Sequence, residues 1–211
     1  DVTVARLGER RFQVGVNGAL DLDWLLRHAP DDGVAVRDVT AGTCGVGLWG
    51  PAARDVVAPL VTTDVSHPAF GYFQARETEL AGLPVTMLRV SYVGELGWEI
   101  YTSAELGARL WDTLWAAGRP HGLVAAGRAA FDSLRLEKGY RAAGVDMTSE
   151  DNPYEAGLER FVHLDSPGYV AAEALRRICD EGTPRVIVGL NMVGVRLDHA
   201  IDPALYTDAA A

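Results

Sequence analysis

One segment of the sequence combines acids, aromatic rings and glycines at spacings that could bind a flat, polar heterocycle. It reads Ser-Tyr-Val-Gly-Glu-Leu-Gly-Trp-Glu-Ile-Tyr over residues 91–101, and its two glycines, three residues apart, allow a tight turn. In a strand beyond that turn, Glu99 and Tyr101 would share one face, while Trp98 and Ile100 would take the other. The carboxylate could accept paired N–H bonds from an aminopyrimidine edge, with tyrosine rings packed on its faces. The plainer alternative is a turn between strands with a surface acid and half-buried tyrosines.

No other chemistry has a recognisable pattern in the sequence. The five histidines lack a metal-ligand spacing such as H-x-x-x-H, so we expect no metal site. Cys44 and Cys179 form neither a metal-binding spacing nor a disulfide framework, which is typical of thiols in a reducing compartment. The sequence contains no nucleophile elbow (G-x-S-x-G), no Walker A motif and no Rossmann glycine pattern.

Charge and hydropathy argue against two classes of partner. The formal net charge is −10, whereas nucleic-acid binding needs clustered Lys and Arg to neutralise phosphates. No apolar run approaches the roughly 20 residues that span a bilayer. The first residues show no signal-peptide pattern, because charged residues interrupt their apolar positions. We therefore expect a cytoplasmic protein with no nucleic-acid or membrane partner.

The elements that must position the 91–101 segment can be predicted from apolar periodicity and from turn residues. Strands are expected at residues 2–4, 12–16, 34–39, 44–49, 77–80, 85–92, 98–101 and 186–190. Helices are expected at residues 21–30, 52–60, 104–117, 126–139 and 169–178, the first of them capped by Asp21 and the third ended by Gly118. Strands and helices are mixed without a strict βαβ alternation, which favours the α+β class.

Two further motifs follow the first segment in the chain. They are Arg-Leu-Glu-Lys-Gly-Tyr-Arg at residues 135–141 and Pro-Tyr-Glu-Ala-Gly-Leu at residues 153–158. In this order, the three motifs resemble the signature of the folate-binding aminomethyltransferase family (the glycine-cleavage T-protein family), which runs S-Y-x-G-E-x-G-x-E, R-L-E and P-x-E-A-G-L. Finer matches at residues 14–18, 37–38 and 47–51 are most similar to its dimethylglycine oxidase branch. The resemblance covers about residues 1–178.

The resemblance implies the fold of that family and a tetrahydrofolate-dependent transfer of a methylene or aminomethyl group. In the oxidase branch, the domain would take an amine-derived iminium or formaldehyde and form 5,10-methylenetetrahydrofolate. FAD would be held by a flavin domain upstream in the same chain. The alternatives are a stand-alone aminomethyltransferase or demethylase, a non-catalytic folate-binding module, or a degenerate product without activity. The non-catalytic members carry K-G-C-x-x-G-Q-E after the A-G-L segment, where this chain reads His-Leu-Asp-Ser-Pro-Gly-Tyr.

The resemblance also assigns roles to individual residues. Asp1 matches an aspartate that acts as base or electrostatic partner when tetrahydrofolate attacks the one-carbon unit. Glu99 matches the acid that binds the amino and ring N–H groups of the pterin. Other matched positions line the folate pocket or touch the cofactor: Thr3, Gly15, Tyr72, Tyr92 and Tyr101.

Other polar residues of the motifs are expected to be structural. Arg135 and Glu137 lie on different faces of a helix and should anchor neighbouring backbone or acids. Glu95 is expected to be a turn residue, and Asp132 and Asp146 to be ordinary exposed acids.

Two positions depart from the family pattern. Phe131 stands where glycine-cleavage enzymes carry an arginine, and Arg160 stands where a tryptophan is usual. The first departure fits the oxidase branch better.

The ends of the sequence suggest a fragment. Residue 1 already lies in a strand pattern, and the last predicted strand is followed by an unfinished tail ending in three alanines. We expect residues 1–178 to form a partial folate-binding domain, incomplete at both ends of the chain, and residues 179–211 to begin a truncated C-terminal segment. Such a fragment alone should be inactive and should bind folate weakly or not at all.

Overall fold

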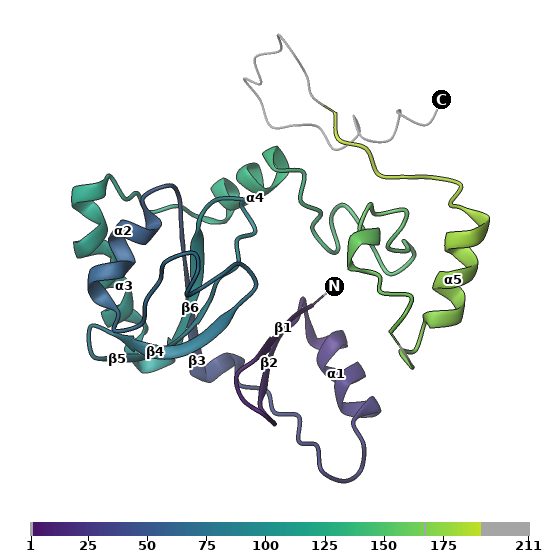
Figure 1. Cartoon of the computed structure of the whole chain (residues 1–211), viewed down its shortest axis with the longest axis horizontal. Helices are drawn as coiled ribbons and strands as arrows, with labels where there is room; N and C mark the ends of the chain where they lie inside the picture. Colours follow the sequence, from purple (N-terminus) through teal and green to yellow (C-terminus); the bar gives the residue numbers. More distant parts are fainter. Residues whose placement is uncertain (1, 167, 191–211) are drawn as a thin grey trace. The chain divides into compact units, whose positions relative to one another are not determined.

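The computed structural model describes residues 2–166 and 168–190, which divide into two compact units (Figure 1). The first unit is Asp1–Thr148 and the second is Ser149–Ala211. The proposed division into a folate domain at 1–178 and a C-terminal segment at 179–211 stays a prediction. No helix in the described part of the chain is long and apolar enough to cross a bilayer.

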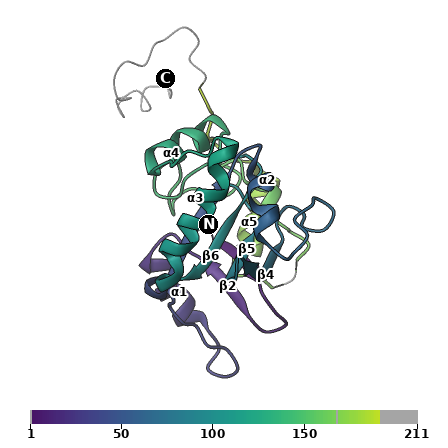
Figure 2. The ribbon, with the colours of Figure 1, turned by 90° about the vertical axis from the view of Figure 1, so that its left-hand side faces the viewer.

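The first unit is built on a four-stranded antiparallel sheet. Its strands are β3 (Thr43–Trp49), β4 (Ala75–Leu80), β5 (Leu83–Leu88) and β6 (Gly97–Ser103), in the order β3-β6-β5-β4. The helices α2 (Ala53–Val57) and α3 (Gly107–Gly118) cover one face of this sheet, as the view from the helix side shows (Figure 2). Antiparallel sheets with packed helices confirm the predicted α+β class.

The core lies between this sheet and the two helices. Trp98 and Ile100 of β6 are fully buried there and pack with Leu110 and Leu114 of α3. Because side chains alternate along a strand, Glu99 and Tyr101 are left on the opposite face, as the sequence predicts. Burying each large apolar side chain contributes about 1.5 to 3 kcal/mol, so the core holds β6 firmly in register.

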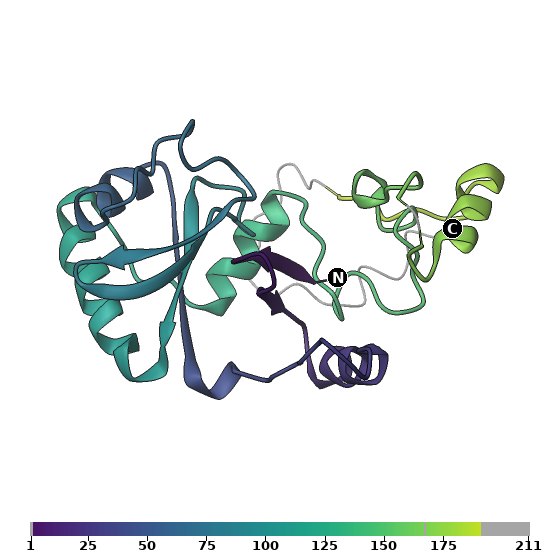
Figure 3. The same ribbon diagram turned by 60° about the horizontal axis from the view of Figure 1, so that its bottom comes forward.

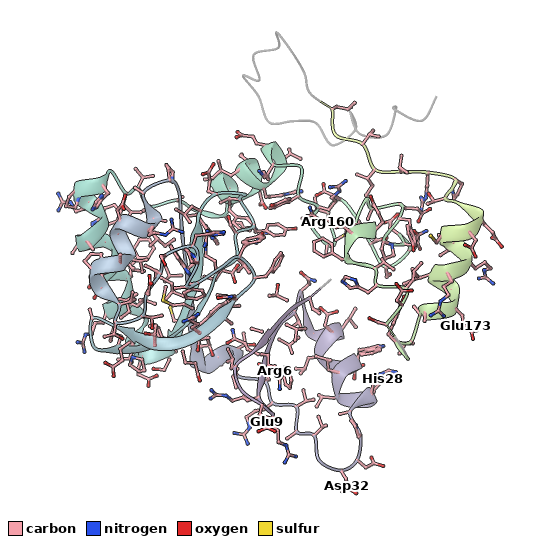
Figure 4. The ribbon with its side chains drawn as sticks, in the orientation of Figure 1. Arg6, Glu9, His28, Asp32, Arg160 and Glu173 are labelled. Carbon is pink, nitrogen blue, oxygen red and sulfur yellow. The ribbon has the colours of Figure 1, made fainter. Side chains whose placement is uncertain are left out.

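A second, two-stranded sheet precedes the main one. It consists of β1 (Thr3–Arg6) and β2 (Phe12–Gly15), followed by α1 (Ala19–His28), all purple in Figure 3. The Arg6 guanidinium donates to the carbonyls of Gly8 and Glu9 and so holds the hairpin turn (Figure 4). The prediction that Asp21 caps the first helix is wrong, because α1 begins at Ala19 with Gly18 as its N-cap. Asp21 lies in the first turn of the helix, and its carboxylate accepts a hydrogen bond from the N–H of Asn17 at 2.8 Å.

Two predicted strands are wrong. Residues 34–39 and 186–190 form no strand, and none of their side chains is buried. An isolated extended segment is not stable without a sheet neighbour, whatever its own propensity. The segment 34–39 is followed by η1 (Thr40–Gly42), and in the last segment the N–H of Ile187 bonds to the carbonyl of Glu155 at 2.8 Å.

The remaining elements are helical. In the first unit, α2 continues into η2 (Ala58–Leu60), η3 (Ala104–Leu106) leads into α3, η4 (Arg119–His121) follows α3, and α4 spans Arg128–Glu137. The second unit contains η5 (Glu159–Phe161) and α5 (Ala172–Glu181). Within this second unit, Arg185 pairs with Asp151 and Glu155 at 3.1 and 3.0 Å.

Candidate functional site

The main sheet places three of the predicted site residues, Glu99, Tyr72 and Tyr92, at or beside one of its ends. Glu99 of β6 lies between Gly47 of β3 and Leu88 of β5, and Leu88 in turn pairs with Ala75 of β4. At this end β4 begins and β5 ends, so the segments carrying Tyr72 and Tyr92 leave the sheet here. We call this region, around the row Gly47–Glu99–Leu88–Ala75, the Glu99 end of the sheet.

The Glu99 carboxylate is held by its neighbour on the same strand face. The Tyr101 hydroxyl donates a hydrogen bond of 2.5 Å to Oε2 of Glu99. Burial, and then this hydrogen bond, raise the pKa of Tyr101 well above its usual value, so the hydroxyl keeps its proton and remains a donor. Gly45 lies directly opposite Tyr101, and a Cβ there would come within 2.9 Å of the tyrosine ring. The glycine therefore leaves room for the ring that orients the acid.

An aromatic cluster stands beside this acid. Tyr92 is half-buried, and its ring stacks on Phe131 of α4 with centroids 5.4 Å apart and planes 9° apart. Its hydroxyl donates to the carbonyl of Arg141, and burial is the main cause that raises its pKa. Tyr140 lies 5.9 Å from Tyr92, and Trp49 lies 5.9 Å from Phe131. Phe131, which stands where glycine-cleavage enzymes carry an arginine, thus contributes an aromatic ring to this cluster.

A cavity of about 450 Å³ adjoins the cluster along β3. It is lined by Gly45 and Gly47, by the rings of Trp49 and Phe131, and by the start of α4. The sequence-predicted site residues do not line it, although Gly47 is the cross-strand partner of Glu99. The indole N–H of Trp49 donates to the carbonyl of Val90 at 3.0 Å and so fixes that wall.

The sequence missed the participation of three residues in this cluster. The sequence assigns no role to Trp49 or Tyr140, and it marks Phe131 only as a departure from the family pattern. Their contacts with one another and with Tyr92 join parts of the chain that are far apart. The one local signal was that Trp49 and Tyr140 lie inside the matched segments 47–51 and 135–141.

The structural roles expected for Arg135 and Glu95 are confirmed. The buried Arg135 guanidinium donates to the carbonyl of Tyr140 at 3.1 Å and pairs with Asp146. The backbone N–H of Glu95, an exposed turn residue, donates to the Ser91 hydroxyl.

The expectation that Asp146 is an ordinary exposed acid is wrong. Its side chain is 27% exposed, it pairs with the buried Arg135, and it accepts the N–H of Ala142 at 2.8 Å. It therefore ties the segment after α4 to the helix. The side chain of Asp132 is more exposed, at 42%, and it pairs with the exposed Arg128 at 3.2 Å and with the buried Arg135 at 3.9 Å.

The other predicted site residues lie on different elements. Tyr72 is 48% exposed in the loop before β4, and its ring lies 4.3 Å from that of Phe73. Thr3 and Gly15 face each other across the β1–β2 sheet. Asp1 lies outside the described residues. The structure thus brings Glu99 and Tyr101 into contact, and puts Tyr72 and Tyr92 at the same end of the main sheet, while Thr3 and Gly15 belong to the other sheet.

Comparisons with known proteins show which family model and which relatives this sequence matches. The family model described as the GCVT N-terminal domain matches residues 1–166. The mitochondrial dimethylglycine dehydrogenase of Homo sapiens is 38% identical over 175 residues, which cover 82% of this chain and 20% of the human protein. The aminomethyltransferase of Moorella thermoacetica is 35% identical over 196 residues, covering 92% of this chain and 53% of that enzyme.

A solved structure is similar over most of the chain. The glycine cleavage system aminomethyltransferase T of Bartonella henselae superposes with a TM-score of 0.71 at 25% identity, covering 86% of this chain and 49% of that one. The predicted fold is confirmed by this likeness. The chain spans about a fifth of the dimethylglycine dehydrogenase and about half of each aminomethyltransferase named here.

Proposed function

This chain belongs to the family of the GCVT N-terminal domain, and we propose that it binds tetrahydrofolate at the Glu99 end of the sheet for one-carbon transfer. The observation that carries the proposal is the carboxylate of Glu99, oriented by the Tyr101 hydroxyl beside a cluster of aromatic rings. A fixed acid next to flat rings suits a heterocycle with paired N–H donors on one edge. The aminopyrimidine end of a pterin is such a heterocycle.

The glycines of β3 allow aromatic rings to pack beside Glu99. Gly45 and Gly47 lie opposite Tyr101 and Glu99, and a Cβ at Gly47 would overlap the ring of Trp49. The two glycines therefore make room for the rings of Tyr101 and Trp49 to lie over β3 beside the acid, where a flat ligand could pack against them. Glu99 would accept the pterin N–H groups, and Tyr92 would supply an aromatic surface whose far side is backed by Phe131.

The proposed reaction needs a base near the nitrogens of the folate that accept the carbon. The family resemblance gives this role to Asp1, whose carboxylate would stabilise the cationic adduct and accept the proton that the adduct loses. The one-carbon donor would be an amine-derived iminium or formaldehyde, and the product 5,10-methylenetetrahydrofolate. The FAD domain that the resemblance implies stays a prediction, and so does a cytoplasmic location.

A stand-alone aminomethyltransferase is the second candidate. It is favoured by the Moorella thermoacetica relative, whose similarity extends over 92% of this chain. Phe131 favours the oxidase branch instead, because its ring stacks on Tyr92 at a position where glycine-cleavage enzymes carry an arginine. The proteins named in the comparisons are enzymes, which argues against a purely non-catalytic module.

The test uses the full-length protein that contains this sequence. Asp1→Ala should lower the yield of methylenetetrahydrofolate by about 100-fold, as expected on removing a positioned base. Tetrahydrofolate affinity, measured by calorimetric titration, and the rate of amine oxidation should stay unchanged. The exposed Asp32, substituted in the same way, is the matched control. Wild-type protein that does not bind tetrahydrofolate would refute the proposal, and an unchanged yield would remove Asp1 from the reaction.

A further inference from the structure

A tight turn before β4 has an unusual residue at its third position. Residues 71–74 form this turn, in which the N–H of Gln74 donates to the carbonyl of Gly71 at 3.2 Å. Phe73 has a φ of 63°, and in a turn with positive φ at this position the usual residue is glycine. Within the described part of the chain, only Phe73 and Ala81 combine a side chain with positive φ. Left-handed backbone costs a residue with a Cβ about 1 to 2 kcal/mol, so this turn is strained.

One buried residue holds the 71–74 turn in this conformation. The carbonyl of Arg89 accepts the N–H of Phe73 at 3.0 Å, and the N–H of Arg89 donates to the carbonyl of Gln74 at 2.8 Å. The guanidinium of Arg89 donates to the carbonyl of Phe70 at 3.1 Å, on the other side of the turn. Arg89 is only 8% exposed. The strained backbone is thus fixed from both sides, which is expected where a strained conformation serves a function.

The fixed turn presents two aromatic rings outward. Phe73 is 66% exposed and Tyr72 is 48% exposed, with ring centroids 4.3 Å apart and planes 56° apart. Neither ring belongs to the core. A turn that needed only to reverse the chain would be more stable with glycine in place of Phe73. The strain and the exposure together indicate that a side chain is required at this position.

The distance from Glu99 indicates which part of a folate could reach the 71–74 turn. The turn leads into β4, which is two strands away from β6 in the sheet. Two strand spacings correspond to about 10 Å. A pterin edge bound by Glu99 would therefore end before the turn, and the next ring of the molecule, the p-aminobenzoyl ring, would lie nearer to it.

We propose that Phe73 is a ligand-binding residue that packs against the p-aminobenzoyl ring of tetrahydrofolate. The proposal rests on the proposed function of the Glu99 end of the sheet. Its chemistry is the contact of an exposed ring with a flat aromatic ring, held ready by a turn that does not have to order on binding.

The test compares Phe73→Gly with Ala81→Gly in the full-length protein. Both substitutions relieve positive-φ strain, and Ala81 lies in the turn at the other end of the β4–β5 hairpin. Phe73→Gly should keep or raise the thermal midpoint and weaken tetrahydrofolate binding about tenfold. A reduced pterin without the p-aminobenzoyl group should bind wild type and variant equally. Ala81→Gly should leave both affinities unchanged.

Three outcomes would overturn the inference. They are an unchanged tetrahydrofolate affinity in Phe73→Gly, an equal loss for tetrahydrofolate and the reduced pterin, and a lower thermal midpoint, which would show that the ring supports the fold. Phe73→Asn should repeat the glycine result, because asparagine also tolerates left-handed backbone. If wild type binds neither ligand, the proposed function fails instead, so the two failures are distinguishable.

Discussion

Removing the hydroxyl of Tyr101 should weaken tetrahydrofolate binding while leaving the sheet intact. In the structure this hydroxyl donates to Oε2 of Glu99 at 2.5 Å, and a hydrogen bond to a charged group contributes about 1.5 to 3 kcal/mol. Tyr101→Phe keeps the ring that fits over Gly45, so packing is preserved. Because the proposed ligand bonds the carboxylate rather than the hydroxyl, only the loss of orientation reaches the ligand. We expect a loss of about 1 kcal/mol, or about fivefold in affinity.

A double-mutant cycle separates orientation of the acid from direct contact with the ligand. Glu99→Gln removes the charge from the proposed pterin contact and should weaken binding by about 1 to 3 kcal/mol. If Tyr101 acts through Glu99, then Tyr101→Phe should have little further effect in the Glu99→Gln background. The coupling energy should be close to the full effect of Tyr101→Phe, about 1 kcal/mol. If instead Tyr101 touches the ligand directly, as the family resemblance implies, the two losses will add.

Calorimetric titration of the full-length protein with tetrahydrofolate near pH 7.5 measures all four affinities. Equal affinity of wild type and Tyr101→Phe would refute the orienting role, and equal affinity of wild type and Glu99→Gln would refute the pterin contact. The pKa of Tyr101 is raised in the folded protein. Its contribution to stability is therefore complete below about pH 10, the usual tyrosine value, and is lost as pH rises toward the higher folded value. Tyr101→Phe should remove that alkaline loss.

Two further predictions concern ion pairs that do not involve Glu99. Asp146→Asn should lower the free energy of unfolding by about 1.5 to 3 kcal/mol in chemical denaturation, because Arg135, whose side chain is 7% exposed, loses its hydrogen-bonded charged partner and keeps only the 3.9 Å pair with Asp132. The backbone N–H of Asn152, and then Arg185, hold the pKa of Glu155 below its usual value. A lowered folded pKa adds stability above the unfolded value of about 4.3, and this stability is lost as pH falls through the folded value. Acidification should therefore loosen the second unit, measured by amide hydrogen exchange at Asn152, and Glu155→Gln should flatten that profile.

Each of these predictions has its own control. Asp23→Asn breaks the exposed pair with Arg27 on α1, with side chains 53% and 73% exposed, and should change stability by less than about 0.5 kcal/mol. Equal losses for Asp146→Asn and Asp23→Asn would contradict the buried-pair argument. If the pH dependence of exchange at Asn152 is the same in wild type and Glu155→Gln, then the Glu155 carboxylate does not cause the loss of stability at low pH.

The sequence alone predicts which side chains of β6 face the core and where most helices and strands lie, because both follow from local periodicity. Alternation alone placed Trp98 and Ile100 in the core and Glu99 on the other face, and the structure agrees. The strands expected at residues 34–39 and 186–190 failed for a non-local reason. Their residues have suitable propensity, but no neighbouring strand pairs with them, and pairing partners are not written in a segment's own sequence.

The arrangement around Tyr92 could not be predicted for a related reason. Its ring meets Phe131 of α4 and Tyr140 of the next loop, and its hydroxyl meets the carbonyl of Arg141. Motif matching identified Tyr92 but not its neighbours. A motif gives the order of residue types along the chain, and it does not show which loops and helices meet in the folded protein. Asp146 illustrates the same limit, because only the fold shows that a polar loop residue neutralises a buried arginine.

Strand β6 carries both core residues and the Glu99 carboxylate, so a change in this strand affects the fold and the proposed site together. A slip of this strand by one residue would exchange the buried Trp98 and Ile100 with Glu99 and Tyr101. That exchange would bury a carboxylate without a matched partner, at a cost of several kcal/mol. The position of Glu99 is therefore set by the core, before any ligand arrives, and β6 variants should lose stability and affinity together. The turn that carries Tyr72 is fixed by hydrogen bonds to Arg89, and the Tyr72 ring is 48% exposed, so this side chain can change affinity with little effect on folding. The half-buried Tyr92 is different, because its contacts with Phe131 and Arg141 also support the fold. We therefore expect substitutions in the Tyr72 turn to change affinity alone, while the Glu99 carboxylate determines which edge of the ligand binds.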